Sequence, residues 1–148
     1  MFQGAATINL DSKGRLAIPA RHRDMLLAHC AGNLVLTADA DGCLLLYPQP
    51  EWQPIRDKLN KLSAFNPKSR ALQRVLVGHA EDVVMDSAGR VLVSPALRNY
   101  AGLDKHVMLI GQGNKFELWD EAKWQAQQQV ALSLMSGDLP PELEGFSL

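Results

Sequence analysis

The sequence predicts an α+β fold made of two tandem copies of one unit, related by a pseudo-two-fold axis. Two internal repeats predict it. The stretch "NLDSKGRLAIP" at 9–19 returns as "VMDSAGRVLVSP" at 84–95, which places Asp-Ser-x-Gly-Arg twice at an offset of 75 residues. Further along, "LLLYPQPEW" at 44–52 returns as "FELWDEAKW" at 116–124, at an offset of 72. Each copy has only about 45 residues, too few to bury a good core alone, so the two copies should pack on one another.

Each copy is expected to run strand, turn, strand, short helix, strand, strand. The first two strands of the copies are expected at 7–10, 15–18, 83–85 and 90–93. The last two are expected at 34–37, 44–47, 107–110 and 116–119. Pro19 and Pro95 each open the short helix, because proline is tolerated in a first helical turn. Gly32 and Gly102 each end it, because glycine can adopt the left-handed cap conformation.

Further helices are expected to follow each copy. Over residues 50–63, apolar side chains recur on one helical face, at Trp52, Ile55, Leu59 and Leu62, with Pro54 in the first turn. A second connecting helix begins at Asn66-Pro67 and is expected to turn three side chains inward: Leu72, Val75 and Leu76. Asp120 caps a helix over 120–135, and the Pro-containing tail after it is expected to be loose. The chain is therefore divided into a first unit at 5–52, connecting helices at 53–79, a second unit at 80–124, and a C-terminal helix with an acidic tail at 125–148.

The net charge is −1, so the whole-chain charge gives no support to nucleic-acid binding, which usually leaves a basic footprint. The charge is uneven, however. Residues 1–30 and residues 31–116 each carry a net charge of +2, whereas residues 117–148 carry −5. A basic face under a near-neutral total is therefore compatible with the sequence.

Several other classes of protein are disfavoured. The start of the chain lacks the basic and apolar regions of a signal peptide, and no apolar run approaches the ~18 residues of a membrane span, so a cytoplasmic setting with reduced thiols is expected. Cys30, Cys43 and His29 lack the paired ligand spacing of a structural zinc site. No metal, cofactor or small-molecule substrate is expected. Trp52, Trp119 and Trp124 are expected to pack in the core or between subunits rather than against bases.

The repeated motif holds more than a turn requires. The Asp11 side chain can accept hydrogen bonds from the backbone two residues on, and Gly14 can supply the positive φ of the turn. Turn formation gives no reason for Arg15. A guanidinium held by the aspartate suits planar recognition of a phosphate or a guanine edge. The alternative is a solvated hairpin tip with a weak surface ion pair, which contributes under about 1 kcal/mol to stability. The second copy repeats these residues as Asp86, Gly89 and Arg90.

An enzymatic interpretation is weaker. Aspartic proteases also join two halves around paired Asp-Ser/Thr-Gly motifs, but here Lys13 or Ala88 separates the serine from the glycine. An arginine four residues on would also lower the pKa of the aspartate. No elbow motif supports a serine nucleophile. The chain is therefore expected not to be an enzyme.

The quoted stretches resemble the MraZ family, which belongs to the AbrB-like, swapped-hairpin superfamily of transcription factors. The resemblance covers nearly the whole chain, with the Asp-x-x-x-Arg signature in both halves. It implies a DNA-binding regulator, without catalytic activity, that recognises short direct repeats upstream of its own division and cell-wall gene cluster. It also implies a ring-shaped homo-oligomer associated with the nucleoid, in which linked weak contacts would multiply the affinity for DNA.

On this interpretation Arg15 contacts base edges or lies close to them. Arg90 makes a secondary contact of the same kind, because Ala88 takes the place of Lys13 in the second turn. Phosphate contacts are expected from Lys13, Arg21 and Arg23. The alternative for Arg21 and Arg23 is that they solvate the first short helix. The residues expected to shape the turns and orient the arginines are Asp11, Gly14, Asp86 and Gly89. A non-catalytic ring that acts as a protein-interaction scaffold is the alternative.

Overall fold

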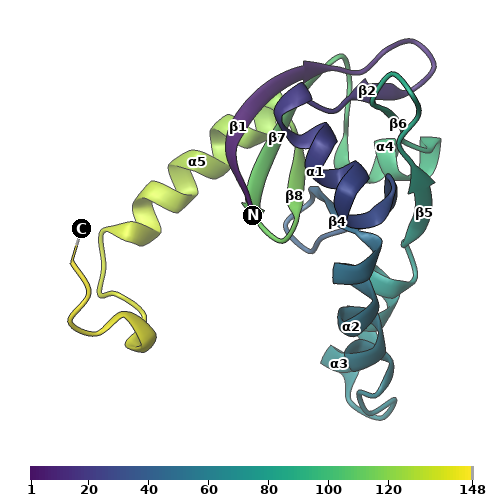
Figure 1. Ribbon diagram of the computed structural model, residues 1–148. Coiled ribbons are helices and arrows are strands. Elements are labelled where there is room, and N and C mark those ends of the chain that lie inside the picture. The colour runs from purple at the N-terminus through teal and green to yellow at the C-terminus, as the bar shows by residue number, and fades with distance from the viewer. Residues whose placement is uncertain (148) are drawn as a thin grey trace.

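The computed structural model describes residues 1–147, in which a six-stranded antiparallel sheet and a separate two-stranded ribbon are surrounded by helices (Figure 1). The strands are β1 (Phe2–Asn9), β2 (Arg15–Ala17), β3 (Asn33–Ala38), β4 (Leu44–Pro48), β5 (Glu81–Val84), β6 (Arg90–Leu92), β7 (His106–Gly113) and β8 (Phe116–Asp120). The helices are α1 (Ala20–Cys30), α2 (Gln49–Asn60), α3 (Pro67–Leu72), η1 (Gln73–Val77), α4 (Pro95–Ala101), α5 (Glu121–Met135) and η2 (Pro141–Leu143). The predicted α+β class is confirmed.

The two copies exchange strands. The order in the large sheet is β1-β7-β8-β4-β3-β5. The first strand of the first copy, β1, pairs with β7 of the second copy, and the first strand of the second copy, β5, pairs with β3 of the first. At the centre, β4 lies against β8, where Leu45 pairs with Glu117, its counterpart at an offset of 72. Each copy therefore completes the sheet of the other about a pseudo-two-fold axis, as a swapped hairpin does.

The ribbon of β2 and β6 follows the same symmetry. Leu16 pairs with Val91, its counterpart at an offset of 75, and both side chains are buried. Backbone hydrogen bonds extend the ribbon beyond this pair: the N–H of Ile18 donates to the carbonyl of Gly89 at 2.8 Å, and the N–H of Val93 donates to Gly14 at 2.8 Å. The turn of each copy is thus fastened to the strand of the other.

Apolar side chains are buried on both faces of the large sheet, because successive residues of a strand point to opposite faces. Along β4, Leu44 and Leu46 join a cluster that α1, α4 and the ribbon cover, while Leu45 and Tyr47 join a cluster under α2, η1 and the start of α5. Trp52 and Trp119 belong to the second cluster, and Trp124 packs against it. Trp52 and Trp119 therefore lie in the core, and Trp124 packs at its edge, in agreement with the predicted packing role.

The expected helix starts are confirmed. The Asn66 side chain accepts hydrogen bonds from the backbone N–H groups of Lys68 and Ser69 at 2.9 and 3.3 Å, and Asp120 caps α5 through the N–H of Lys123 at 3.2 Å. The end of α1 differs slightly from the prediction. Its left-handed cap falls on Ala31, at a φ of 53°, one residue before Gly32.

The first strand and the segment after α3 also differ from the sequence-based expectation. β1 begins at Phe2 rather than at Thr7, because all eight of its residues pair with β7. After α3 the chain widens into the π-helical turn η1, where the N–H of Gly78 donates to the carbonyl of Gln73 at 2.9 Å. Val75 and Leu76 in this turn are half-buried, whereas Leu72, the last residue of α3, is 43% exposed rather than inward.

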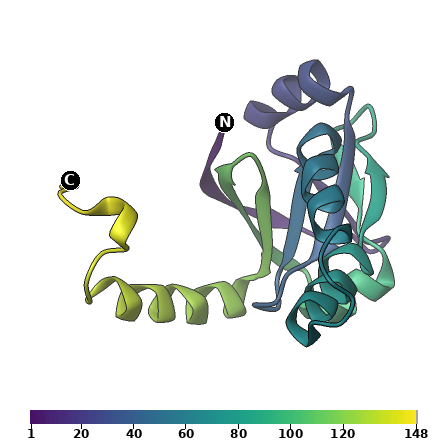
Figure 2. The same cartoon turned by 90° about the horizontal axis from the view of Figure 1, so that it is seen from below.

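The C-terminal helix α5 leaves the body of the molecule (Figure 2). Its first turns pack on the sheet through Trp124, whose ring lies 6.1 Å from that of Trp119. From residue 128 to residue 147 every residue is exposed, including the short turn η2. No helix within residues 1–147 combines the length and the apolar character that crossing a membrane requires.

Candidate nucleic-acid interface

The first Asp-Ser-x-Gly-Arg turn is built around the Asp11 carboxylate. The backbone closes the turn, since the N–H of Gly14 donates to the carbonyl of Asp11 at 3.0 Å and the N–H of Asp11 donates to the carbonyl of Arg15 at 2.8 Å. The Oδ1 atom of Asp11 accepts from the backbone N–H groups of Lys13 and Arg15, at 2.9 and 2.8 Å. The Asp11 carboxylate therefore stabilises the turn by accepting hydrogen bonds from the backbone of the turn itself.

The second carboxylate oxygen of Asp11 holds the arginine. The Nε of Arg15 donates to Oδ2 of Asp11 at 2.9 Å, which fixes the direction in which the guanidinium leaves the strand. The second turn has the same geometry, with Nε of Arg90 at 3.0 Å from Oδ2 of Asp86 and the backbone of Arg90 at 2.8 Å from Oδ1. The Asp–Arg contact inferred from the spacing is thus present in both turns.

These hydrogen bonds lower the pKa of both aspartates. For Asp11 the largest effect comes from the backbone N–H of Arg15; partial desolvation opposes it, while the guanidinium of Arg15 and the N–H of Lys13 lower the pKa further. Asp86 follows the same pattern through Arg90 and Ala88. Both carboxylates are therefore charged at neutral pH and cannot act as the shared-proton acid–base pair of a protease.

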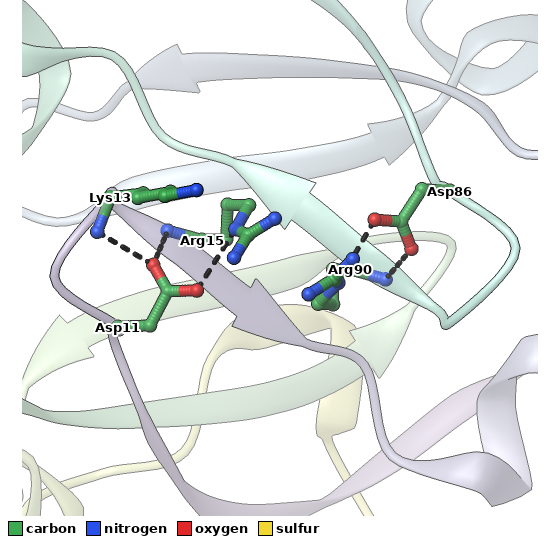
Figure 3. Close-up of polar contacts among 5 residues, drawn as sticks. All are labelled: Asp11, Lys13, Arg15, Asp86 and Arg90. Carbon is green, nitrogen blue, oxygen red and sulfur yellow. Dashed lines mark hydrogen bonds and ion pairs between the residues drawn. The ribbon is translucent and has the colours of Figure 1, made fainter.

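The two arginines lie on one face of the ribbon. Figure 3 shows the guanidinium groups of Arg15 and Arg90 between the two aspartates, with the Lys13 side chain extending along the same face. Leu16, the next residue along β2, is buried on the opposite face of the ribbon. The side chains of Arg15 and Arg90 are 30% and 40% exposed. The outer face of the ribbon thus presents two pre-oriented guanidinium groups related by the pseudo-two-fold axis.

The two motif glycines are required by both conformation and space. Gly14 has a φ of +80° and Gly89 a φ of +76°, in the left-handed region that other residues rarely adopt. A Cβ on Gly14 would lie 2.9 Å from Cζ of Arg98 and 3.0 Å from the carbonyl oxygen of Val93. A Cβ on Gly89 would collide with the Arg23 side chain. Each turn therefore rests on an arginine that the helix of the other copy supplies.

Arg23 and Arg21 are engaged within the chain. The Nε of Arg23 donates to the carbonyl of Ile18 at 2.6 Å while the guanidinium packs against Gly89. Arg21 lies over Gly4, near the start of β1, and its Nε donates to Nε2 of His22 at 3.2 Å. Arg21 and Arg23 therefore contact other residues of the same chain, and neither joins the pair formed by Arg15 and Arg90.

Sequence reasoning missed the role of Arg98, the counterpart of Arg23 at an offset of 75. Its Nε is buried beside Gly14 and has no hydrogen-bond partner among residues 1–147. The signal was present in the sequence, since both copies carry this arginine at the same distance from the motif. The sequence alone does not distinguish an arginine that packs under a glycine from an arginine on the surface, because the distinction depends on the geometry of the turn.

The cysteines do not meet as metal ligands. Cys30 donates to the carbonyl of Leu26 at 3.2 Å, whereas Cys43 lies with Asp39 and Glu117, their potential ligand atoms within 4.8 Å of one another. Burial first, and then these two carboxylates, raise the pKa of the Cys43 thiol far above its usual range. The thiol is therefore protonated at neutral pH in the metal-free chain.

Exchanged strands, duplicated Asp-x-x-x-Arg turns and a symmetric arginine ribbon together define a duplicated protein of the AbrB-like, swapped-hairpin class. Comparison with known families agrees with this class. The sequence model described as "MraZ protein, putative antitoxin-like" matches residues 1–75 and again residues 76–138. The chain belongs to the MraZ family, as the resemblance predicted.

Three full-length relatives carry the same name. The chain is 59% identical to the transcriptional regulator MraZ of Nitrosomonas eutropha and 60% identical to that of Nitrosospira multiformis, in each case over 148 residues and the full length of both chains. It is 53% identical over 152 aligned positions to the protein of the same name from Escherichia coli, again over the full length of both. The relatives are named as regulators and not as enzymes, which agrees with the prediction of a non-enzyme.

Proposed function

We propose that the chain is a DNA-binding transcriptional regulator that recognises short direct repeats upstream of the division and cell-wall gene cluster and regulates its own expression there. The observation that carries the proposal is the pair of guanidinium groups of Arg15 and Arg90 on the outer face of the β2–β6 ribbon, each held by an aspartate. Membership of a family whose relatives are named transcriptional regulators supports the coarser part of the proposal.

The chemistry of the ribbon suits DNA. A two-stranded β-ribbon fits the major groove, where a guanidinium can donate two hydrogen bonds to O6 and N7 of guanine. Arg15 would suit such a contact because Asp11 accepts a hydrogen bond from its Nε, which leaves the two terminal nitrogens available to a ligand. Lys13 extends along the same face and would bind phosphate. Arg90 would make the secondary contact, since its turn carries Ala88 in place of the lysine.

The roles first expected of Arg21 and Arg23 change in this proposal. Arg23 supports the second turn through Gly89 and Ile18, so its effect on DNA binding would act through the shape of the ribbon. Arg21 lies over Gly4. Phosphate binding is therefore assigned first to Lys13, with Arg21 as a more distant contributor.

A ring of subunits would compensate for the weak charge of each chain. Each subunit would bring one ribbon to one repeat, and linkage would raise the affinity through effective concentration. A regulator of this kind acts in the cytoplasm at the nucleoid. The alternative is a ring that serves as a protein-interaction scaffold.

Footprinting tests the proposal. DNase I protection by the wild-type chain should appear as short, evenly spaced segments on a fragment from upstream of its gene, and a reporter driven by that fragment should respond to the wild type but not to Arg15→Ala. Uniform protection, or none, would contradict repeat recognition. A protein that assembles into a ring but does not bind DNA at low salt would favour the protein-interaction scaffold.

A further inference from the structure

A cleft with a volume of about 710 Å³ lies beside the first Asp-Ser-x-Gly-Arg turn. Its walls come from three segments of the chain: residues 9–12, one side of α4, and the loop that joins α4 to β7. Neither Arg15 nor Arg90 lines it, so the cleft is separate from the arginine face of the ribbon. A volume of this size is typical of a site for a small molecule.

The two copies differ at the loop that forms one of these walls. The helix α1 has eleven residues and reaches β3 through residues 31–32, whereas α4 has seven residues and reaches β7 through residues 102–105. Residues 103–105 of this longer connection line the cleft. The loop is fastened to the opposite wall, since the N–H of Leu10 donates to the carbonyl of Lys105 at 2.9 Å. This wall is therefore a feature of the second copy and not a requirement of the repeated unit.

The matched arginines of α1 and α4 are used differently. On α1 the Nε of Arg23 donates to the carbonyl of Ile18 at 2.6 Å. Arg98, its counterpart on α4, lines the cleft, and its Nε is buried without a hydrogen-bond partner among residues 1–147. A buried donor of a charged group is costly to leave unpaired. Arg98 is therefore placed to donate to an acceptor that the chain itself does not supply.

Two cationic and two anionic side chains line the cleft. Lys105 is exposed and forms no ion pair within residues 1–147. Of the two acids, Asp11 is already used, because its carboxylate accepts hydrogen bonds from the backbone of the turn and from Arg15. The other acid, Asp104, is exposed and opposes the two cations. The available donors of Arg98 and Lys105 favour an anion, and phosphate is the anion that such side chains typically bind.

Apolar side chains complete the walls of the cleft, from Leu10, Pro95 and Leu103. A bare phosphate ion would leave this apolar surface in contact with water, whereas the organic part of a larger phosphate would cover it. We propose that the cleft binds a small organic phosphate, with the phosphate group at Arg98 and Lys105 and the apolar part of the ligand against these three residues.

The position of the cleft gives this ligand an effect on DNA binding, and this part of the inference rests on the proposed function. Asp11 lines the cleft and also holds Arg15, while Arg98 lies against Gly14 of the same turn. A bound phosphate neutralises positive charge beside the turn and adds negative charge there, which repels the DNA backbone. The affinity of the regulator for its repeats should therefore fall as the ligand becomes abundant.

Isothermal titration calorimetry of the full-length chain with phenyl phosphate tests the site. Phenyl phosphate joins one phosphate group to one apolar ring, whereas inorganic phosphate and phenol each supply only one of these two parts. The wild type should bind phenyl phosphate more tightly than it binds either part alone. No heat of binding at millimolar phenyl phosphate, or equal affinity for phenyl phosphate and inorganic phosphate, would overturn the proposal.

Substitutions of two exposed residues assign the binding to this cleft. Lys105→Gln should weaken the binding of phenyl phosphate about tenfold, whereas Asp104→Asn removes the opposing charge and should strengthen it severalfold. Lys58→Gln is the matched control, because Lys58 is an exposed lysine of α2 that does not line the cleft. All three variants should keep the circular dichroism spectrum of the wild type. Equal affinities in Lys105→Gln and Lys58→Gln would overturn the site.

Fluorescence anisotropy with a repeat duplex at fixed ionic strength distinguishes the ligand site from the proposed function. Phenyl phosphate should lower the affinity of the wild type for the duplex severalfold, and Lys105→Gln should need correspondingly more of it. A Lys105→Gln variant that loses DNA affinity, while the wild type binds no phenyl phosphate, would assign the cleft to a DNA phosphate and overturn the proposal. A wild type that binds phenyl phosphate but no DNA would overturn the regulator and leave the ligand site standing. Binding of both without mutual effect would overturn the regulatory part.

Discussion

Leu16 pairs with Val91 at the centre of the β2–β6 ribbon, so the pseudo-two-fold axis passes between these two side chains. The pairing sets Arg15 opposite Leu92 and Arg90 opposite Ala17. Both arginines consequently point to the same side, while the central pair is buried in the core beneath them. A duplicated sequence thereby builds a symmetric two-arginine face from one chain.

Asp11→Asn separates the orienting role of the aspartate from its role in the turn. The asparagine oxygen can still accept the backbone N–H groups of Lys13 and Arg15, but an amide NH₂ replaces the oxygen that holds Nε of Arg15. We expect an unchanged unfolding midpoint and a severalfold weaker affinity for the repeats, measured by chemical denaturation and fluorescence anisotropy. Asp11→Ala should lose both stability and affinity. Full affinity in Asp11→Asn would show that the ion pair does not orient the arginine for DNA.

Gly14→Ala should destabilise the chain more than Gly42→Ala. Both glycines have a positive φ, which costs another residue about 1–2 kcal/mol. A Cβ at Gly42 meets nothing within 4 Å, whereas one at Gly14 meets the backbone oxygen of Val93 at 3.0 Å and the Arg98 side chain. Urea denaturation should give a larger loss of unfolding free energy for Gly14→Ala. Equal losses would mean that contact between the turn and the other copy contributes nothing.

His22 should make the stability depend on pH. Its ring is buried between Phe2 and Phe116, with centroids 5.7 and 4.9 Å away. Desolvation first, and then the charge of Arg21, lower its pKa below the usual 6.5. The unfolded chain therefore binds a proton first as the pH falls through about 6.5, and the free energy of unfolding should decrease from that pH downward.

Thermal unfolding between pH 7.5 and 5.5 measures this effect. The melting temperature of the wild type should fall as the pH is lowered from 7.5 to 5.5, and the melting temperature of His22→Phe should fall less. The exposed His106, which contacts Asn9 at 3.3 Å, supplies the control, since His106→Gln should keep the wild-type slope. An unchanged slope in His22→Phe would assign the pH dependence to other groups.

Local patterns in the sequence predicted the local structure well. The turns form where Asp and Gly flank them, and Asn66 and Asp120 cap their helices, because each of these features depends on residues within a few positions. The π-helical turn at Gln73–Val77 did not follow from apolar periodicity, because a wider turn shifts every later side chain. The length of β1 also depended on a partner strand about a hundred residues away.

For the site, the repeated motif predicted the pairing of Arg15 with Asp11, because both residues lie in one turn. It did not predict that Arg23 supports the second turn or that Arg98 lies under the first, since each contact crosses between the copies. Charge counting placed Arg23 with the other basic residues of the first copy. Only the exchanged topology shows that its guanidinium is used inside the molecule.

The most direct test of the central claim is the affinity of Arg15→Ala for labelled duplexes with tandem repeats and with scrambled sequence, measured by fluorescence anisotropy over a salt series. Arg56→Ala is the matched control, since Arg56 pairs with Asp57 on α2, away from the ribbon. The wild type and the control should prefer the repeats, with affinity that falls steeply as salt rises. Arg15→Ala should lose the preference, a loss of about 1–3 kcal/mol per lost base contact, and keep its assembly size. An Arg15→Ala variant that still prefers the repeats as the wild type does would contradict the claim that the ribbon recognises DNA.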